Sequence, residues 1–308
     1  GGNNGGEAGI QNETATVQEQ GTDSNTDSTG STVSLAQDGR ALQIPDDNYR
    51  TYYELFVYSF YDSDGDGIGD LQGVLEKLDY LNDGDDTTDT DLGVNGIWLM
   101  PVMPSTTYHK YDTTDYENID PQYGTLETFR ELLAACHDRR IRVILDLAMN
   151  HSSSSHPWFL QAAEYLKSLP EGVEPDTSEC PYVDYYHFSR EYQGGYVQLN
   201  GTDWYYEARF WDGMPDLNLQ SEAVRREFEQ IADFWLDMGV DGFRLDAVKE
   251  YVTGSTKDNV EILSWFADYV HGKDPENYLV CECWTEQNTY AKYYESGVGS
   301  MFDFAFSA

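Results

Sequence analysis

The chain has 308 residues, of which 40% are hydrophobic and 14% aromatic, so it is long enough to build a packed core in one large domain or two smaller ones. Acidic residues outnumber basic ones by 56 to 18, which gives a formal net charge of −38. Such a surface repels nucleic-acid phosphates and anionic lipid, so we expect no nucleic-acid partner. No apolar run is long enough to predict a transmembrane segment.

Residues 1–48 contain no aromatic residue and are rich in Gly, Asn, Thr, Ser, Gln, Asp and Glu. Such a segment cannot bury enough apolar surface to offset the entropy lost on ordering, so we predict a disordered, low-complexity tether. The chain starts at Gly1 without Met, as expected of a chain from which a leader has been removed. A tether at this end suits a protein that is secreted or tethered at a cell surface.

Segments typical of strands and helices alternate from residue 49 onward. The predicted strands are 52–61, 93–103, 141–149, 240–248 and 278–284, with a further candidate at 301–306. The predicted helices are 70–81, 126–139, which begins at a Thr125 cap, 222–238 and 260–270. Residues 151–217 interrupt the alternation and carry few helix signals. Apolar strands separated by helices favour a parallel sheet, and a doubly wound sheet and a (β/α) barrel both fit.

The segment 62–70 reads Asp-Ser-Asp-Gly-Asp-Gly-Ile-Gly-Asp, which places carboxylates at alternate positions of a Gly-rich turn. Ca²⁺ takes six to eight oxygen ligands, so converging carboxylates and a backbone carbonyl could hold it. The candidate ligands are Asp62, Asp64, Asp66, Ile68 and Asp70. Gly73 stands where an EF-hand has its closing Glu, so this is not an EF-hand. The alternative is a solvated acidic turn, in which the unpaired carboxylates would repel one another.

The segment Gly242-Phe-Arg-Leu-Asp246 ends a predicted strand. Alternate residues of a strand share a face, so Arg244 and Asp246 point the same way. A neighbouring Arg keeps a carboxylate ionised and orients it, which suits a nucleophile. The alternative is a buried structural salt bridge.

Glu282 lies between Cys281 and Cys283 in the next predicted strand. Apolar surroundings disfavour its ionised form and raise its pKa, as a general acid requires. A retaining glycosidase needs two such carboxyl groups about 5–5.5 Å apart, one as nucleophile and one as acid/base. We interpret both cysteines as buried apolar residues, because their spacing fits neither a zinc site nor a disulfide framework.

Asp146, Asn150 and His151 close a third apolar strand, where polar side chains are costly without hydrogen bonds or a ligand. Single histidines are usually structural, but this one follows a strand in the same way as Asp246 and Glu282. Clustering of polar residues at the carboxyl ends of several strands is typical of a TIM barrel, although a doubly wound enzyme would also show it. We therefore expect substrate contact here.

Six motifs in order resemble glycoside hydrolase family 13, the α-amylase family, from about residue 49 to the end. They are 62–70, 108–112 with 120–124, 146–151, 214–218, 242–246, and Glu282 with Trp284. The resemblance implies a (β/α)₈ TIM barrel, truncated after about strand 5 or 6, with an irregular domain B inserted after strand 3. The expected division is a tether at 1–48, barrel strands 1–3 at 49–150, domain B at 151–217, and the incomplete barrel at 218–308.

The resemblance also implies roles for individual residues. Asp246 would be the nucleophile and Glu282 the acid/base, and the loop at 62–70 would hold Ca²⁺. The implied substrate-binding residues are Tyr111, which would stack on the sugar, and Asp146, His151, Arg244 and Lys249.

Details within these motifs favour an endo-acting α-amylase that cleaves α-1,4 bonds of starch and maltooligosaccharides. Ala247 and Lys249 are amylase-like, and Tyr108 replaces an Asp with which exo-acting members grip the terminal glucose. Glu250 departs from the pattern, since many α-amylases have a sugar-binding His there.

Two alternatives remain open. One is an α-glucosidase or transglycosylase of the same family, and the other is a non-catalytic glycan-binding relative. Relatives of the second kind typically lack one carboxylate, whereas this chain has both. We expect a monomer when the barrel is complete. The family's third carboxylate is not found before Ala308, so we expect the 308 residues alone to be inactive.

Overall fold

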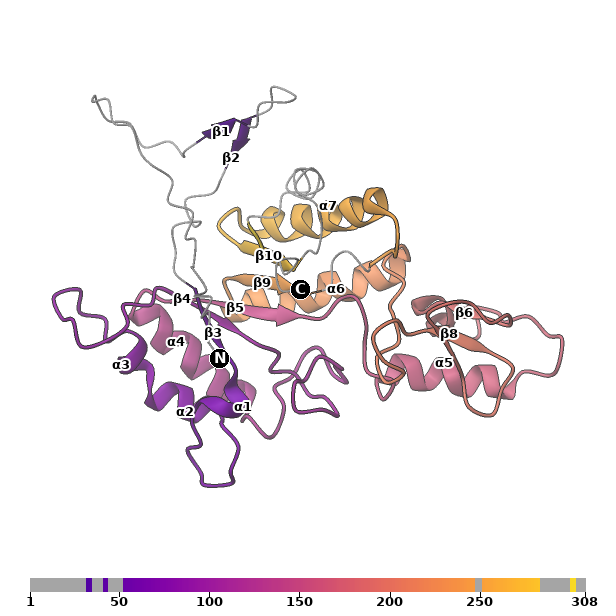
Figure 1. Cartoon of the computed structure of the whole chain (residues 1–308), viewed down its shortest axis with the longest axis horizontal. Coiled ribbons are helices and arrows are strands. Elements are labelled where there is room, and N and C mark those ends of the chain that lie inside the picture. Colours follow the sequence, from indigo (N-terminus) through magenta and orange to yellow (C-terminus); the bar gives the residue numbers. More distant parts are fainter. Residues whose placement is uncertain (1–31, 35–40, 44–51, 247–250, 283–299, 303–308) are drawn as a thin grey trace, which may run out of the picture.

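The computed structural model describes residues 32–34, 41–43, 52–246, 251–282 and 300–302, with only the backbone for 32–34, 41–43, 282 and 300–302. Its centre is a six-stranded sheet in which every neighbouring pair is parallel (Figure 1). The strands are β3 Tyr52–Leu55, β4 Gly96–Leu99, β5 Arg142–Leu147, β9 Gly242–Leu245, β10 Tyr278–Glu282 and β11 Ser300–Phe302.

The order of these strands distinguishes between the two folds that the sequence left open. Across the sheet the order is β11-β10-β9-β5-β4-β3, so each strand lies beside its predecessor in the chain once the insertion between β5 and β9 is set aside. A doubly wound sheet reverses direction at a switch point, whereas a barrel adds strands in sequence. The sheet is therefore an arc of a (β/α) barrel, and the candidate sixth strand near residue 301 is confirmed as β11.

Helices cover the outer face of this arc, and side-chain caps determine where four of them begin. The helices are α1 Val57–Phe60, α2 Leu71–Glu76, α3 Leu78–Leu81, α4 Leu126–Asp138, α6 Glu222–Met238 and α7 Thr256–Lys273. Asp70, Thr125, Ser221 and Ser255 each accept a hydrogen bond from a backbone N–H in the first turn of the helix that follows. Gly239 ends α6 with a φ of 116°, a conformation that favours glycine.

The two faces of the sheet have different side chains. Residues such as Leu145, Leu245 and Cys281 join the main core beneath the helices. The alternate residues form a separate small cluster on the inner face, consisting of Trp98, Ile144, Tyr278 and Val280 with Tyr52 packed against it. Because strand side chains alternate, the polar residues Asp146 and Arg244 continue this inner face toward the carboxyl ends of the strands.

The insertion between β5 and β9 forms a lobe beside the sheet (Figure 1). It contains α5 Pro157–Ser168, the 3₁₀ helix η2 Pro181–Tyr185, and an antiparallel sheet of β6 Phe188–Ser189, β7 Tyr196–Gln198 and β8 Tyr205–Glu207. An isolated bridge between His151 and Asp216 joins the beginning of the lobe to its end, and a second bridge joins Tyr186, in the middle of the lobe, to Leu217. The chain therefore leaves and re-enters the barrel at one place.

Three sequence predictions need correction here. The predicted strand at 52–61 stops at Leu55, and α1 follows it, because the carbonyls of Val57 and Tyr58 turn toward the backbone of Gly69. The predicted helix at 70–81 divides at Lys77 into α2 and α3. The lobe was expected to carry few helix signals, yet α5 is a 12-residue helix.

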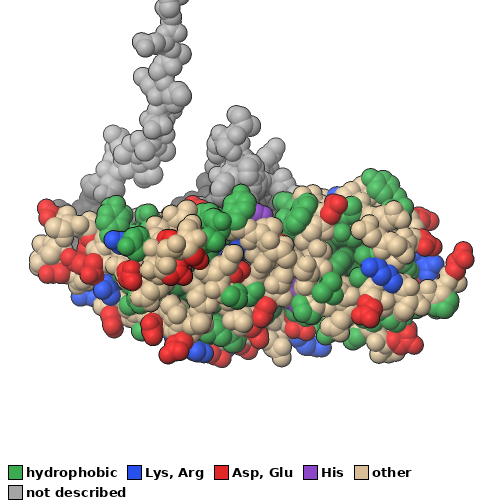
Figure 2. Space-filling view, turned by 90° about the horizontal axis from the view of Figure 1, so that it is seen from below, with side chains coloured by type: hydrophobic (Ala, Val, Ile, Leu, Met, Phe, Trp, Pro, Cys, Tyr) green, Lys and Arg blue, Asp and Glu red, His purple; other side chains and the backbone are tan. Residues whose placement is uncertain are grey.

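The predicted tether mostly lies outside the described residues. Within it, β1 Thr32–Ser34 and β2 Ala41–Gln43 pair as antiparallel strands. In the described part of the chain, none of the helices has the length and apolar character needed to span a membrane. The visible face in Figure 2 carries scattered acidic side chains and fewer basic ones, as the net charge of −38 requires.

Candidate active site and metal loop

Asp146, on β5, is the centre of a buried polar network on the inner face. Its carboxylate accepts hydrogen bonds from Arg244 Nη1 at 3.1 and 3.2 Å, from the Tyr111 hydroxyl at 2.9 Å and from Trp98 Nε1 at 3.1 Å. The side chains of Arg244 and Asp146 are only 3% and 0% exposed. Three protein donors thus engage this carboxylate, so the structure places Asp146 where it positions Arg244 and Tyr111.

The electrostatics of the network follow from burial. Burial raises the pKa of the Asp146 carboxyl, while Arg244 and the hydrogen bonds from Tyr111 and Trp98 oppose that rise by favouring the ionised form. Burial and the nearby Asp146 carboxylate also raise the pKa of the Tyr111 hydroxyl far above its usual value. Tyr111 therefore stays protonated and acts as a hydrogen-bond donor.

His151, which follows β5, is buried and neutral. Burial lowers the pKa of its imidazole to about 4. Its Nε2 lies 3.1 Å from the backbone carbonyl oxygen of Tyr111, and its Nδ1 lies 3.3 Å from the Asn150 side-chain amide. A neutral ring satisfies both contacts if Nε2 carries the proton and Nδ1 accepts from Asn150. The structure thus joins four of the predicted residues in one network: Tyr111, Asp146, His151 and Arg244.

Asp246 directly follows β9 and is buried. Cys281 pairs with Leu245 across β9 and β10, so Asp246 and Glu282 are the next residues along two neighbouring parallel strands. Such strands lie about 4.8 Å apart, which is close to the separation that a retaining pair of carboxyl groups needs. The side chain of Glu282 and residues 247–250, including Lys249, lie outside the described residues.

Sequence reasoning missed two residues of this site. Trp98 donates to Asp146, and its ring lies 4.8 Å from the Arg244 guanidinium. The buried Tyr116 hydroxyl donates to the backbone carbonyls of Ala148 and His151 and so fixes the chain after β5. Only strand alternation could have placed Trp98 on the inner face, and the register that brings it to Asp146 cannot be read from one sequence.

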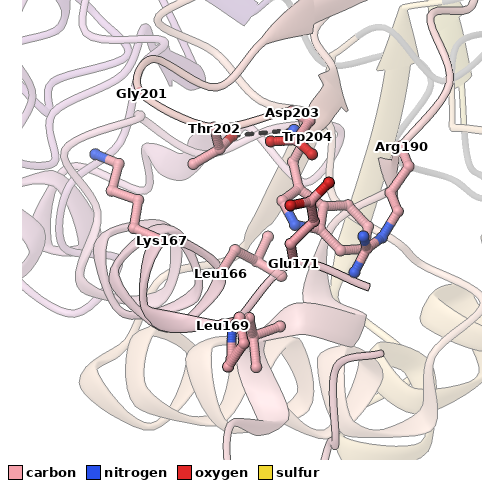
Figure 3. Close-up of a pocket in the computed structure, with 10 residues that line it drawn as sticks. Leu166, Lys167, Leu169, Glu171, Arg190, Gly201, Thr202, Asp203 and Trp204 are labelled. Carbon is pink, nitrogen blue, oxygen red and sulfur yellow. Dashed lines mark hydrogen bonds between the residues drawn. The ribbon is translucent and has the colours of Figure 1, made fainter. Parts of the chain in front are cut away.

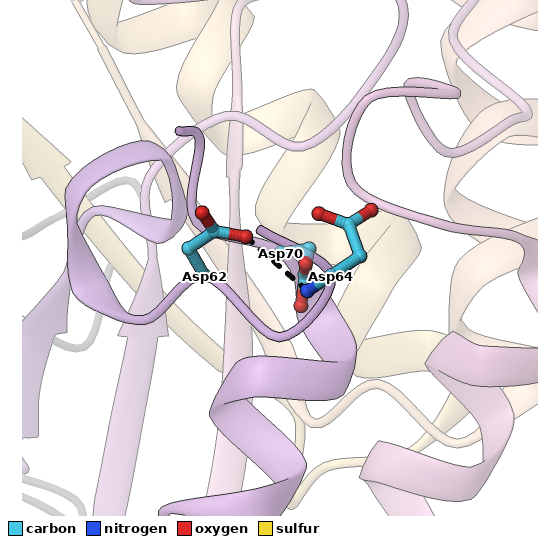
Figure 4. A group of neighbouring side chains, drawn as sticks. All are labelled: Asp62, Asp64 and Asp70. Atoms are coloured by element: carbon cyan, nitrogen blue, oxygen red, sulfur yellow. Dashed lines mark hydrogen bonds between the residues drawn. The ribbon is translucent and has the colours of Figure 1, made fainter. Parts of the chain in front are cut away.

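The predicted metal loop brings together three of its four candidate carboxylates. One carboxylate oxygen from each of Asp62, Asp64 and Asp70 lies within 4.8 Å of the others (Figure 4). Asp66 accepts a hydrogen bond from the Ile68 N–H at 2.8 Å, and its carboxylate does not belong to the group of three. The Ile68 carbonyl stays a predicted ligand.

The donor atoms of this loop fit a hard divalent cation. All three are carboxylate oxygens, which Ca²⁺ prefers. A hydrogen bond from the Gly67 N–H is the main reason why the pKa of Asp62 is lowered. The Asp66 N–H favours ionised Asp64, but desolvation and the neighbouring carboxylates outweigh it and raise the pKa of Asp64. A bound cation would relieve this repulsion.

Two cavities of about 400 Å³ are lined by none of the residues of the network around Asp146. One is in the lobe between the end of α5 and residues 201–204, where Arg190 lies over the Trp204 ring at 4.5 Å (Figure 3). It contains none of the predicted site residues. The other is lined by residues 104–108 and 120–122 together with Tyr58, and Tyr108 at its edge is 63% exposed.

Comparisons with known proteins agree on the family. Residues 54–308 match the family described as "Alpha amylase, catalytic domain". "Alpha-amylase 3" of Dictyoglomus thermophilum is 42% identical over 262 residues, which is 83% of this chain and 47% of that protein. "Trehalose synthase/amylase TreS" of Mycolicibacterium smegmatis is 38% identical over 229 residues, covering 68% of this chain and 35% of that protein. "Oligo-1,6-glucosidase" of Parageobacillus thermoglucosidasius is 36% identical over 210 residues, covering 64% and 34%.

Solved structures agree as well. "Eubacterium rectale Amy13B" shares 59% sequence identity with a TM-score of 0.80, covering 85% of this chain and 49% of that one. The α-amylase from H. orenii shares 44% identity with a TM-score of 0.71, covering 82% and 51%. The chain thus spans about half of these proteins, and a third to a half of the curated relatives. On these matches and the barrel arc described above, the chain belongs to the α-amylase catalytic-domain family, as its motifs predicted.

Proposed function

We propose that the protein is a retaining glycoside hydrolase that cleaves α-1,4 bonds of starch-like α-glucans, with Asp246 as nucleophile and Glu282 as acid/base. The observation that carries the proposal is the adjacent placement of these two residues at the ends of β9 and β10, beside the buried Arg244–Asp146 pair. The names of the relatives include α-amylase, oligo-1,6-glucosidase and trehalose synthase/amylase, which support a glycosidase or a related transfer reaction.

The proposed reaction has two steps. Asp246 attacks the anomeric carbon while Glu282 protonates the leaving oxygen, and a covalent glycosyl–enzyme intermediate forms. Glu282 then removes a proton from water, which displaces Asp246 and releases the sugar. Arg244, two residues before Asp246 on the same strand face, favours the ionised form that a nucleophile needs. Neutral His151 and protonated Tyr111 lie beside the proposed sugar site as uncharged polar groups.

We propose endo-action within the chain of the glucan. Tyr108 is exposed at the edge of the cavity formed by residues 104–108 and 120–122, and this side of the site therefore has room for further sugar units. An α-glucosidase or transglycosylase is the second candidate, because the oligo-1,6-glucosidase and trehalose synthase/amylase relatives carry those names. Early products from amylose distinguish them: a spread of maltooligosaccharides supports endo-action, and glucose alone supports exo-action.

We also propose a structural Ca²⁺ in the loop containing Asp62, Asp64 and Asp70, since its oxygen donors suit that ion. When bound, the ion would neutralise the loop and hold the connection between β3 and α2. The protein is proposed to act as a monomer that is secreted or tethered at a cell surface, as expected from the composition of residues 1–48.

Substitution of both carboxylates in the full-length protein tests the assignment. Asp246→Asn and Glu282→Gln should each lower kcat on soluble starch by at least about 10²-fold. A positioned proton-transfer group such as Glu282 usually contributes that much, and the covalent intermediate cannot form without the Asp246 nucleophile. The control is Asp203→Asn, an exposed carboxylate in the lobe. Near-normal turnover in either variant, with normal melting behaviour, would remove that residue from its role.

A further inference from the structure

Two bulky aromatic side chains are exposed side by side in the turn that follows β8. Phe210 is 50% exposed and Trp211 is 47% exposed. Single exposed hydrophobic residues are common on protein surfaces, but adjacent large ones indicate a contact surface when they lie near a binding site.

The backbone of this turn is fixed by hydrogen bonds. Met214 N–H donates to the Trp211 carbonyl at 2.8 Å, and the Tyr206 hydroxyl donates to the Asp212 carbonyl at 2.8 Å. Ser154 N–H, from the segment after β5, donates to the Gly213 carbonyl at 2.9 Å. The aromatic pair is thus presented by a braced turn that is tied to the segment after β5.

Gly213 has a specific role in presenting Trp211. A Cβ atom at Gly213 would lie only 2.3 Å from two carbons of the Trp211 ring. Gly213 does not have a positive φ, so the backbone itself would accept alanine. Glycine is needed here for space: it lets the indole ring lie against the backbone of the turn, which supports the ring while it stays half exposed.

The turn is continuous with the candidate active site. The Phe210 ring centroid lies 5.7 Å from that of His151, whose Nε2 contacts the Tyr111 carbonyl. In addition, Ser152 N–H donates to the Pro215 carbonyl at 3.2 Å. Trp211 is one residue from Phe210, so it lies on the rim of the site, and a chain-like substrate that leaves His151 on this side would reach it.

We propose that Trp211 is a platform on which a glucose unit of the α-glucan stacks beyond the units held at the cleavage site, so that it favours long chains over short ones. The inference rests on the proposed function. A pyranose ring presents an apolar C–H face to an aromatic ring, while its hydroxyls reach water and polar neighbours. A neutral sugar also meets no repulsion from a protein of net charge −38, unlike an anionic partner.

The test compares two substrates in the full-length protein. Trp211→Ala should lower kcat/KM for maltoheptaose by about 3- to 10-fold, the size expected for losing one aromatic stacking contact. The loss on 4-nitrophenyl α-maltoside, which is too short to reach the rim, should be smaller. Trp211→Tyr, which keeps a ring, should recover most of the activity. The matched control is Tyr192→Ala, which removes a 70% exposed ring from another part of the lobe.

Gly213→Ala provides an independent variant that keeps Trp211. The added methyl group would displace the ring, so this variant should reproduce the substrate-dependent loss of Trp211→Ala. Equal losses on both substrates, or a lower melting temperature in Trp211→Ala, would overturn the proposal and indicate that another segment or protein packs on the ring. No loss on maltoheptaose would overturn it as well.

A binding experiment separates this proposal from the proposed function. In the Asp246→Asn background, maltoheptaose should change the intrinsic tryptophan fluorescence, and Trp211→Phe should remove most of that change. If the wild-type protein fails to hydrolyse α-glucans but shows this Trp211-dependent signal, the platform stands and the hydrolase assignment fails. Maltoheptaose binding that is unaffected by Trp211→Ala would reject the platform whatever the activity.

Discussion

Substitution of Asp146 with Asn should lower the free energy of unfolding far more than the small change in the side chain suggests. The carboxylate is the ionic partner of Arg244, and both side chains are almost completely buried. Asn preserves the shape but removes the negative charge, so the buried guanidinium beside Trp98 loses the charge of the carboxylate to which it donates. Breaking one side of a buried ion pair typically costs about 3–5 kcal/mol. At about 2–4 °C per kcal/mol, the melting temperature should fall by at least about 6 °C.

The matched control is an ion pair of similar geometry at the surface. Arg225 donates to both carboxylate oxygens of Glu261, at 2.9 and 2.7 Å, but the Glu261 side chain is 58% exposed. Because exposed pairs contribute about 0–1 kcal/mol, Glu261→Gln should lower the melting temperature by at most about 4 °C. The difference between the two variants isolates burial as the cause, since both replace a carboxylate with an amide.

Differential scanning calorimetry of the full-length protein measures both variants under the same conditions. Activity on starch provides a second readout, because Arg244 and Tyr111 lose the acceptor that positions them. Equal and small shifts for Asp146→Asn and Glu261→Gln would refute the reasoning. They would mean that Arg244 finds another partner, and that the buried network does not depend on this carboxylate.

Two further predictions concern pH and metal. Burial lowers the pKa of His156 to about 4, below the unfolded value of 6.5. The neutral imidazole therefore stabilises the fold above the unfolded pKa, and this stability is lost as the pH falls toward the folded pKa. Protonation of His156 should lower the free energy of unfolding by about 2 kcal/mol between pH 7 and pH 5. His156→Asn keeps a capping acceptor for α5, and in this variant the free energy from urea denaturation should fall by about 2 kcal/mol less over the same pH range. The same fall in the variant and the wild type would contradict this prediction. A chelator should lower the melting temperature of the wild type through loss of bound Ca²⁺, and Asp62→Asn should abolish this response whereas the exposed Asp85→Asn should not. No chelator effect after confirmed metal removal would count against the loop.

Two helices were predicted with their ends, because caps act locally, whereas the helix predicted at 260–270 extends over Thr256–Lys273 as α7. Thr125 starts α4 as expected, and the predicted helix at 222–238 has the observed bounds of α6. Strand centres were also predicted, although each observed strand is shorter than its apolar run. The apolar residues beyond the strands pack in loops after the chain has left the sheet, and a hydrophobic pattern alone cannot distinguish these positions.

The errors arise where tertiary contacts outweigh local preference. Residues 57–60 are aromatic-rich and typical of a strand, yet they form α1 because their carbonyls face Gly69. The helix α5 carries a signal that sequence reasoning overlooked, since its buried residues follow helical spacing after a Pro at the first turn. These residues are Phe159, Ala162, Ala163 and Leu166.

The candidate site illustrates the same division. Asp146, Arg244 and Asp246 could be identified because they are polar residues near the ends of apolar strands. Burying such residues costs free energy unless they make hydrogen bonds or bind a ligand. Their mutual arrangement depends on register, which pairs Asp146 with Arg244 across β5 and β9. The register of β4 against β5, which pairs Trp98 with Ile144, places Trp98 beside Asp146. No local pattern in β4 predicts the hydrogen bond that Trp98 makes.

Register also explains why the motif that ends at Asp246 begins with glycine. A Cβ atom at Gly242 would lie 1.9 Å from the Tyr278 carbonyl oxygen, so β10 can approach β9 at this point only if residue 242 has no side chain. That approach aligns Gly242 with Tyr278 and, three residues further on, Leu245 with Cys281. The next residue on each strand is one of the two proposed catalytic carboxylates. A larger residue at 242 would therefore shift the strands at one end of the sheet and misplace Asp246 and Glu282 at the other, although it contacts neither of them.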